Sequence, residues 1–404
     1  MSIVIFGYQS IEDTPYHEWI PEVMDKVILL CNSEIADSYP DHLYNKIIIE
    51  NYNYNVNLEK IVIDLHKNNN IETIIALDEF DIERAGRLRS YLGIHGQDSH
   101  SALLYRDKYL MKTKLHNENI SVTPFRELRS VIDLIDFIYK HNYPVVVKPK
   151  SLAGSLGVRI LTNEKELSDL LTNGIPNNCM VEKYVEGTMY HIDGLITNHE
   201  VSFLYPSVYK STCLDWSLGG YTASYLLSRK NMLFNNLKDF VQKAIEALSL
   251  PEHSPFHAEV FVTTDGKLLF NEVGSRVPGG RSNYEIYHGT NINFNKVTVR
   301  HQCGLKEEFS FNQSFLTGHI YIPPIDGILV DIPDIVPNDK VIEYLPNKKL
   351  IGKDHSDAKS SVDCVATIIC KGESEEEISR NIEEIYNYII QNTKWITSKE
   401  TSKY

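Results

Sequence analysis

Two glutamates and an arginine stand close together in the segment HAEVFVTTDGKLLFNEVGSR, which runs from His257 to Arg276. Two apolar runs joined by a Thr-Asp-Gly turn predict a β-hairpin here. Because side chains alternate along a strand, Glu259 and Glu272 can face the same side of this hairpin. Paired carboxylates resist joint ionisation unless a cation lies between them, and their hard oxygen atoms suit Mg²⁺. Arg276 adds a rigid donor fork for an anion, although a solvated acidic hairpin is the simpler alternative.

A second group of candidate residues precedes the hairpin. Lys148 ends the apolar run VVVKP, where a buried ammonium group is costly without an anionic partner. Lys108 is a candidate for a second phosphate contact, although either lysine alone is more simply a solvated side chain. The loop 151–157 lacks the Walker A pattern, but its small residues can bring backbone N–H groups close to phosphate oxygens. The candidate contacts in this loop are Ser151, Gly154, Ser155 and Gly157.

The composition is that of an ordinary globular protein and excludes several classes of function. A chain of 404 residues has room for two or three domains. The net charge of −14 argues against nucleic acid as a main partner. No apolar run approaches the ~20 residues of a membrane span, and the N-terminus lacks the basic region of a signal peptide. The six cysteines show no metal-binding spacing. We therefore expect a cytoplasmic protein without membrane partners.

The elements that must position these residues follow two patterns. Apolar runs of strand length alternate with helical patterns near the N-terminus and predict a parallel sheet covered on both faces. No GxGxxG follows Gly7, so a dinucleotide-binding Rossmann site is not expected. The expected strands are 2–7, 26–31, 46–50 and 73–77, with helices at 58–68 and 82–92.

The rest of the chain predicts a largely antiparallel sheet and a small α+β subdomain. A helix opened by Asp107 is expected before a strand that starts at about 122. Further helices are expected at 129–141 and 237–248, with strands at 144–149, 180–187, 190–196, 200–210 and in the 257–272 hairpin. From about 316, the strands GHIYIP, GILVDIP, KVIEYLP and CVATIICKG and a helix at 373–390 predict the subdomain.

In order and approximate spacing, residues 106 to about 295 resemble an ATP-grasp domain. The pieces that carry the resemblance are DK at 107–108, VVVKP at 145–149, the loop 151–157, EKYVEG at 182–187, YHIDG at 190–194, HAE at 257–259 and NEVGSR at 271–276. The resemblance implies a mixed α/β and α+β fold in three parts. These parts are an α/β pre-ATP-grasp domain (1–105), an ATP-grasp domain (106–300) with a mobile lid at about 120–183, and a C-terminal α+β subdomain (301–404).

The resemblance also implies that ATP binds with Mg²⁺ or Mn²⁺. Two lysines, Lys108 and Lys148, would hold the α- and β-phosphates under the 151–157 loop. Because Met189 stands where relatives often carry a ribose-binding glutamate, Glu186 or Asp193 would contact the ribose. The purine slot would be formed by one carboxylate, two backbone groups and one apolar side chain, which belong to Glu182, Lys183, Tyr184 and Val185.

At the reacting end of the site, the resemblance implies that Glu259 and Glu272 ligate the metal ion. Arg276 would stabilise an acyl phosphate, and Lys210 would reach the γ-phosphate. Many relatives carry asparagine where this chain has Gly274, so one expected metal ligand is absent. The aromatic stretch 203–226 and Arg281 would border the reacting carboxylate, with Arg281 holding a second carboxylate by its fork. Sheet-packing aromatics and an exposed arginine are the alternative for these last two.

Such a site suits the activation of a carboxylate as an acyl phosphate, which a nucleophile then attacks. The chain resembles dipeptide-forming L-amino-acid ligases and related tailoring enzymes of natural-product pathways. That resemblance implies a small-molecule carboxylate, expected to be an amino acid, an amine, and an amide or peptide product. A carrier-protein thiol as nucleophile, a biotin-carboxylase-like reaction and a non-catalytic nucleotide-binding module stay open as alternatives. The sequence leaves a homodimer open as well.

Overall fold

The computed structural model describes residues 2–217, 219–355 and 363–397. Its N-terminal part contains a parallel four-stranded sheet with the strand order β3-β2-β1-β4, which confirms the parallel sheet predicted from the apolar runs. β2 is buried along its whole length, because a parallel sheet covered on both faces has no solvated side. The strands are β1 (Ser2–Gly7), β2 (Val27–Asn32), β3 (Lys46–Ile49) and β4 (Ile71–Ala76).

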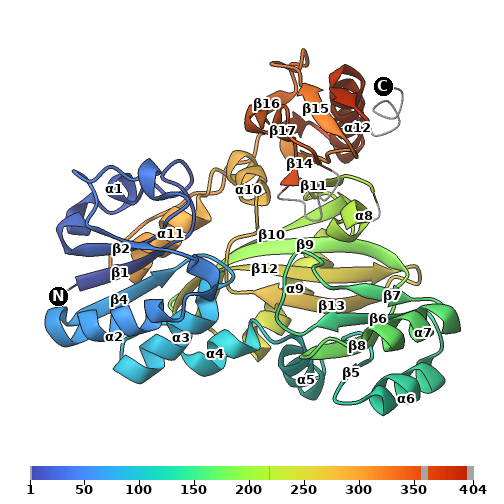
Figure 1. Ribbon diagram of the computed structural model, residues 1–404, viewed down its shortest axis with the longest axis horizontal. Coiled ribbons are helices and arrows are strands. Elements are labelled where there is room, and N and C mark those ends of the chain that lie inside the picture. Colours follow the sequence, from blue (N-terminus) through green and yellow to red (C-terminus); the bar gives the residue numbers. More distant parts are fainter. Residues whose placement is uncertain (1, 218, 356–362, 398–404) are drawn as a thin grey trace.

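Helices cover both faces of this sheet (Figure 1). Leu58 of α2 packs in the core on one face, and Val299 of α11 packs in the core on the other. Since α11 lies between β13 (Leu268–Gly274) and β14 (Leu316–Ile322) in sequence, the chain returns to the N-terminal part before it enters the last subdomain. The helices of this part are α1 (Tyr16–Trp19), α2 (Asn57–Asn69), α3 (Asp81–Leu92), α4 (Ser99–Leu104) and α11 (Phe294–Gln302), with short 3₁₀ turns at η1 (Pro21–Lys26), η2 (Ala36–Ser38) and η3 (Tyr52–Tyr54).

A second, antiparallel sheet forms the centre of the molecule. Its strand order is β13-β12-β9-β10-β11-β14-β17-β16. The amphipathic helix α9 (Phe234–Ala247), expected at 237–248, packs against β9, β10, β12 and β13. The strands are β9 (Gly187–Thr197), β10 (Glu200–Ser211), β11 (Thr222–Leu226), β12 (His253–Thr263), β13 (Leu268–Gly274), β14 (Leu316–Ile322), β16 (Val341–Pro346) and β17 (Ala366–Gly372).

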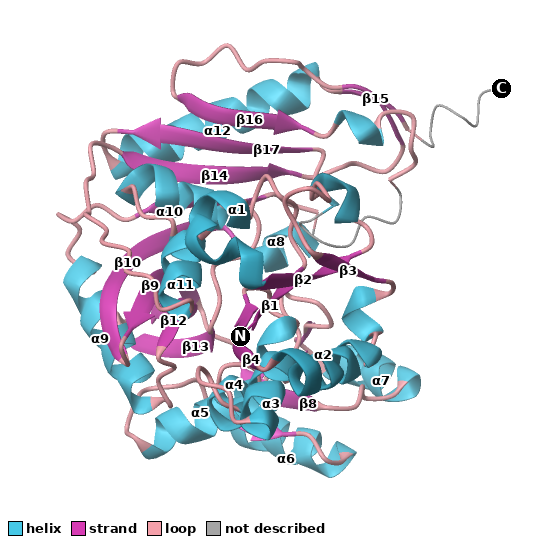
Figure 2. Cartoon of the chain, turned by 90° about the vertical axis from the view of Figure 1, so that its left-hand side faces the viewer, coloured by secondary structure: helices cyan, strands magenta, loops and turns pink. Residues whose placement is uncertain are grey.

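The last three strands of this sheet come from the region expected to form a separate C-terminal subdomain. β14 pairs with β11, with Thr222 opposite Tyr321, so one sheet continues across the expected boundary at residue 300. Figure 2 shows β14, β17 and β16 side by side. The helix α12 (Glu375–Asn392) packs against β14 and β17. Other elements here are α8 (Cys213–Ser217), α10 (Ser282–Thr290), η4 (Lys348–Leu350) and a separate pair of strands, β15 (Ile328–Asp331) and β18 (Lys394–Ile396).

A third, smaller sheet lies in the region expected to form the lid, and we call it the lid sheet. Its strand order is β5-β8-β6-β7, and α6 and α7 pack on it around Leu134 and Leu170. The preceding helix α5 (Lys108–Asn117) opens at Asp107, as predicted. The strand expected at 180–187 is instead divided between β8, which ends at Lys183, and β9, which begins at Gly187 in the large sheet. The lid elements are β5 (Phe125–Glu127), α6 (Val131–His141), β6 (Val145–Pro149), β7 (Arg159–Leu161), α7 (Glu164–Asn173) and β8 (Cys179–Lys183).

Among the described residues, no helix combines the length and the apolar character that crossing a membrane requires.

The shared sheet predicts that β14 carries part of the central core. Ile320 on β14 is fully buried in the cluster that also holds residues of β9 and β12. We expect Ile320→Ala to lower the free energy of unfolding by about 2–5 kcal/mol, measured by urea denaturation. Ile335→Ala in the same subdomain is the control, because Ile335 is 70% exposed, and it should change stability by at most about 0.5 kcal/mol. Equal effects of the two variants would contradict a shared core.

Candidate active site

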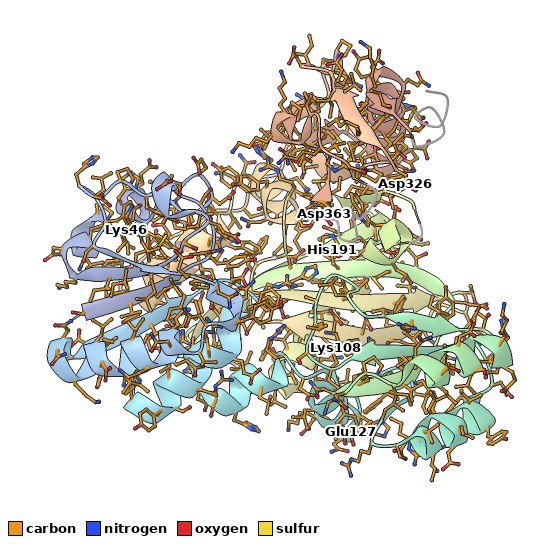
Figure 3. The ribbon with its side chains drawn as sticks, viewed as in Figure 1. Lys46, Lys108, Glu127, His191, Asp326 and Asp363 are labelled. Carbon is orange, nitrogen blue, oxygen red and sulfur yellow. The ribbon has the colours of Figure 1, made fainter. Side chains whose placement is uncertain are left out.

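A cavity of about 280 Å³ lies at the junction of the lid sheet and the large sheet. Lys108, which lines it, is labelled in Figure 3. Its walls come from the 151–157 loop, the segment after β8, and strands β10, β12 and β13. Ten of the residues predicted from the sequence line it: Lys108, Lys148, Gly154, Ser155, Glu182, Lys183, Tyr184, Val185, Glu259 and Glu272. Residues that are more than one hundred positions apart in sequence therefore meet in one cavity.

The acidic hairpin presents its carboxylates to this cavity through an irregular register. Glu259 on β12 lies directly opposite Glu272 on β13, so the two side chains share a face. The pairing then shifts by one residue, which makes Asn271 the extra residue of a β-bulge. Asn271 therefore also reaches the cavity, where its amide nitrogen donates to Glu259 at 2.9 Å. Tyr209 donates to the other oxygen of Glu259 at 3.3 Å.

Lys108 faces the acidic hairpin from the first turn of α5. The side chain of Asp107 caps this helix by accepting from the next backbone N–H groups, which fixes where the lysine begins. The Lys108 ammonium group lies 3.3 Å from a carboxylate oxygen of Glu272 and donates to the carbonyl of Leu152 at 2.6 Å. Burial lowers the pKa of Lys108, and the neighbouring Glu272 offsets this only in part. An additional anion in the cavity would relieve that cost.

Glu182 is the counter-ion of two buried lysines. One carboxylate oxygen lies 2.6 Å from the ammonium group of Lys148, and the other lies 2.5 Å from that of Lys112. Burial alone would raise the pKa of Glu182, but the two lysines lower it to about 2. At Lys112 the effect of burial is larger than that of Glu182, and the pKa falls to about 8. At Lys148 the neighbouring carboxylates together outweigh burial and raise the pKa. Lys148 also donates to Asn271 at 3.1 Å.

Sequence reasoning did not single out Lys112 or Asn271. Lys112 lies one helical turn after Lys108 on α5, so the spacing of four residues could have revealed it. Asn271 gave no such signal, because strict alternation would direct it to the face opposite Glu272 and only the bulge brings it round.

The 151–157 loop closes the lid side of the cavity. Gly154 has a positive φ of 62° and Gly157 one of 74°, conformations that favour glycine. A side chain at Gly157 would also meet the ring of Pro149 at 2.9 Å. Ser151 lies beside the cavity, and its carbonyl accepts from Arg106 at 2.5 Å. The loop thus carries Gly154 and Ser155 into the lining, whereas Ser151 and Gly157 lie outside it.

The sequence pattern of the ATP-grasp domain family matches residues 141–283. This part of the chain is therefore similar to an ATP-grasp domain. An L-arginine-specific L-amino acid ligase from Bacillus subtilis is 27% identical over 258 residues, which are 62% of this chain and 61% of that protein. The match therefore spans less than two thirds of the relative's length.

Solved structures share the fold over almost the whole chain. An L-amino acid ligase from Bacillus licheniformis superposes with a TM-score of 0.78 at 19% identity and covers 98% of each chain. The biotin carboxylase domain of a 2-oxoglutarate carboxylase from Hydrogenobacter thermophilus, solved with MgADP and bicarbonate, gives a TM-score of 0.69 at 16% identity, with 98% of this chain and 90% of that chain covered. These likenesses confirm the ATP-grasp fold expected from the sequence.

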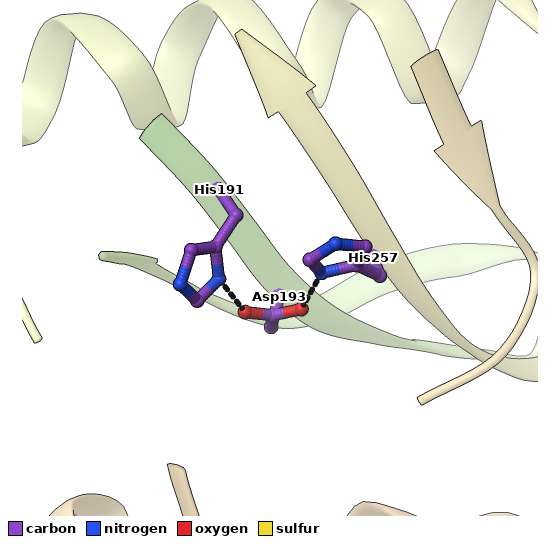
Figure 4. Close-up of side chains that lie close together, drawn as sticks. All are labelled: His191, Asp193 and His257. Carbon is purple, nitrogen blue, oxygen red and sulfur yellow. Dashed lines mark hydrogen bonds and ion pairs between the residues drawn. The ribbon is translucent and has the colours of Figure 1, made fainter. Parts of the chain in front are cut away.

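Two residues considered for the ribose of an ATP-grasp site lie elsewhere. Glu186 is exposed and lies outside the cavity lining. Asp193 is fully buried between two histidines, with one oxygen 2.6 Å from His191 and the other 2.6 Å from His257 (Figure 4). The three side chains offer atoms within 4.8 Å of one another, but separations of 2.6 Å are those of charge-assisted hydrogen bonds. Asp193 raises the pKa of His257 to about 9, although burial alone would lower it.

Two residues considered for the reacting end are engaged by the C-terminal subdomain. Lys210 donates to Ser379 and to Glu383 of α12, each at 2.7 Å. Arg281 forms an ion pair with Glu343 of β16 and lies 3.7 Å above the ring of Tyr284. Neither residue lines the cavity, because each meets a carboxylate of the neighbouring subdomain instead.

The aromatic stretch 203–226 divides in a similar way. Tyr209 lines the cavity, whereas Trp216 clusters with Tyr321 and Cys364, and Tyr221 stacks on Tyr386 of α12 with ring centroids 4.3 Å apart. Leu218 of this stretch lies outside the described residues. Of these aromatic residues from the stretch expected to border the reacting carboxylate, Tyr209 lines the cavity, and Trp216 and Tyr221 do not.

The arrangement around Glu182 predicts a pH-dependent stability. Glu182→Gln leaves two buried ammonium groups without their carboxylate, so we expect it to lower the free energy of unfolding by about 3–5 kcal/mol at pH 7. Because the pKa of Glu182 is lowered in the folded state from its ordinary 4.5 to about 2, its contribution is complete above pH 4.5 and is lost as the pH falls toward 2.

Urea denaturation of both proteins at pH 7 and at pH 3.5 measures this effect. The difference between wild type and Glu182→Gln should be smaller at pH 3.5. Glu186→Gln is the matched control, because this nearby carboxylate is exposed, and it should cost no more than about 0.5 kcal/mol. A difference that grows on acidification would contradict the assigned charge state.

Proposed function

We propose that the chain is an ATP-dependent ligase that activates a carboxylate, expected to be that of an amino acid, as an acyl phosphate and joins it to an amine. The observation that carries the proposal is the cavity in which buried Lys108 and Lys148 face Glu259 and Glu272. Cations on one wall and carboxylates on the other suit a polyphosphate bound together with a divalent cation. The sequence relative from Bacillus subtilis, an L-arginine-specific L-amino acid ligase, supports an amino acid as substrate.

The residues present fit ATP with Mg²⁺. Glu259, Glu272 and the amide oxygen of Asn271 form an all-oxygen donor set, which suits Mg²⁺ or Mn²⁺. Lys108 and Lys148 would hold the phosphates, and an anion there would relieve the burial that lowers the pKa of Lys108. When bound, MgATP supplies the phosphoryl group and neutralises the charge that spreads over its oxygens.

The remaining residues would bind, orient and exclude water. Since both oxygens of Glu182 are paired with lysines, we assign it to holding Lys148. The purine slot then falls to Lys183, Tyr184 and Val185, which line the same cavity. The 151–157 loop would cover the phosphates, because an acyl phosphate hydrolyses in water. Arg276 would offer its guanidinium to the developing negative charge.

A phosphate-release screen tests the proposal. With ATP, Mg²⁺ and a panel of amino acids offered as acid and as amine, at least one pair should release phosphate and yield a product whose mass is that of the two substrates less one water. Hydroxylamine should trap the acyl phosphate as a hydroxamate. If ATP binds but no acid and nucleophile release phosphate, the ligase proposal fails.

The alternatives give different products in the same screen. Transfer to a carrier-protein thiol would raise the mass of the carrier, and a carboxylase would depend on bicarbonate. The amide product is the one expected, in line with the amino acid ligase relative.

Glu272→Gln tests the metal-binding assignment. Losing one carboxylate ligand should lower kcat for phosphate release on the order of 10²-fold or more, because charge that develops in the transition state is no longer neutralised. Isothermal titration with ADP in the absence of Mg²⁺ should show binding retained. The control is Asp265→Asn at the exposed turn of the same hairpin, which should behave as wild type. Unchanged turnover in Glu272→Gln would remove this carboxylate from the catalytic site.

A further inference from the structure

One carboxylate of the N-terminal domain reaches the end of the acidic hairpin. Glu79 stands in the loop between β4 and α3, and its side chain is only 13% exposed. One of its oxygens accepts from Arg106, which precedes α5, and the other accepts from Nε of Arg276, which follows β13. Glu79 is therefore the shared partner of two arginines that enter from different parts of the chain.

Arg106 extends this link to the lid. Arg106 donates through its other terminal nitrogen to the carbonyl of Ser151, the first residue of the 151–157 loop, at 2.5 Å. Burial, and after it the positive charge of Arg276, lowers the pKa of Arg106 to about 10. A carboxylate between the two guanidinium groups offsets their mutual repulsion. Glu79 thus accepts from both guanidinium groups at the place where they converge.

Gly274 makes room for this carboxylate. A Cβ atom on Gly274 would lie 3.2 Å from a carboxylate oxygen of Glu79 and 3.4 Å from Cγ of Arg276. The first contact is tighter than an ordinary van der Waals contact, so a longer side chain at this position would have to displace Glu79 or Arg276. The glycine that departs from the usual ATP-grasp pattern thus stands where the N-terminal domain inserts its own acidic side chain.

We propose that Glu79 is a positioning residue and that the glycine at position 274 is matched to it, because this glycine leaves room for the carboxylate. Glu79 holds Arg276 where the acyl phosphate forms and couples it through Arg106 to the 151–157 loop. The role rests on the proposed ligase function, because Arg276 has its task only in that reaction. Glu79 does not line the nucleotide cavity. Its loss should therefore affect the chemical step and leave nucleotide binding intact.

Kinetics of Glu79→Gln test the positioning role. The amide keeps the shape of the side chain but removes the carboxylate charge that both arginines contact. We expect kcat for phosphate release to fall about 10- to 100-fold, because a displaced guanidinium no longer meets the developing charge. KM for ATP and the Kd for ADP by isothermal titration should stay within about twofold of wild type, since the phosphate-binding lysines are untouched.

Two comparisons distinguish positioning from a general structural role. Glu72→Gln, an exposed carboxylate on the neighbouring strand β4, should behave as wild type. Arg276→Lys and Glu79→Gln should combine non-additively in kcat, because both act through the same guanidinium. An active wild type with unchanged kcat in Glu79→Gln, or full additivity of the two changes, would overturn the positioning role. A weakened Kd for ADP that accounts for the whole loss of activity would overturn it as well.

A stability cycle tests the match between Glu79 and Gly274 independently of any activity. Gly274→Ala should lower Tm in the wild-type background, where its Cβ meets Glu79, and should lower it less in a Glu79→Ala background. Equal shifts in both backgrounds would overturn the match. If no acid and amine pair releases phosphate with the wild type, the ligase proposal fails, and the cycle still decides whether the two residues are matched.

Discussion

A single buried carboxylate shared by two lysines sets the charge balance at the centre of this protein. Glu182 lies on the lid sheet, Lys112 on α5 and Lys148 on the adjacent lid strand, and all three are almost fully buried. Burying an ammonium group without a partner is costly, and one carboxylate cannot fully compensate two of them. The surplus positive charge is balanced from the opposite wall, where Lys108 approaches Glu272 and Lys148 contacts Asn271 beside Glu259. Lysine ammonium groups and carboxylates therefore alternate along the junction of the lid sheet and the large sheet.

That alternation depends on a local irregularity in the hairpin. In a regular antiparallel pair, Asn271 would point away from Glu272 and Lys148 would lose one of its partners. The bulge in the pairing after Glu259 lets Asn271 and Glu272 both face the cavity. One extra residue in β13 thus places three oxygen-bearing side chains, two charged and one neutral, on a single wall.

The sequence allowed the fold and the charged centre of the site to be predicted, because both depend on local patterns. Alternation identified Glu259 and Glu272, an apolar run ending in lysine identified Lys148, and the resemblance to an ATP-grasp domain supported Lys108. Asn271 escaped because a bulge breaks the period on which the prediction rested. Glu79 and Arg106 escaped for another reason, since their meeting with Arg276 depends on how the N-terminal domain packs, which no short pattern encodes.

Lys210, Arg281 and Asp193 show why residue type alone is a weak guide near such a site. The chemistry that suits a charged side chain to a phosphate or a carboxylate ligand also suits it to joining subdomains. Lys210 and Arg281 meet Glu383 and Glu343 of the C-terminal subdomain. Asp193 lies in a buried chain of hydrogen bonds that passes through His191 and Ser224, at 2.9 Å from each other, to Glu285 of α10.

Polar contacts join the N-terminal part, the large sheet and the C-terminal part next to the site. Glu79 connects the N-terminal part to the end of β13 through Arg276. The hydrogen bonds that run from Asp193 to Glu285 connect the large sheet to α10, and Glu285 contacts His319 on β14. A displacement of any of the three parts would therefore alter the surroundings of Glu259, Glu272 or Arg276. The proposed acyl transfer requires its charged groups to be in place before the reaction begins. A site assembled from three parts therefore needs the polar contacts between the parts to be as well satisfied as those within the cavity.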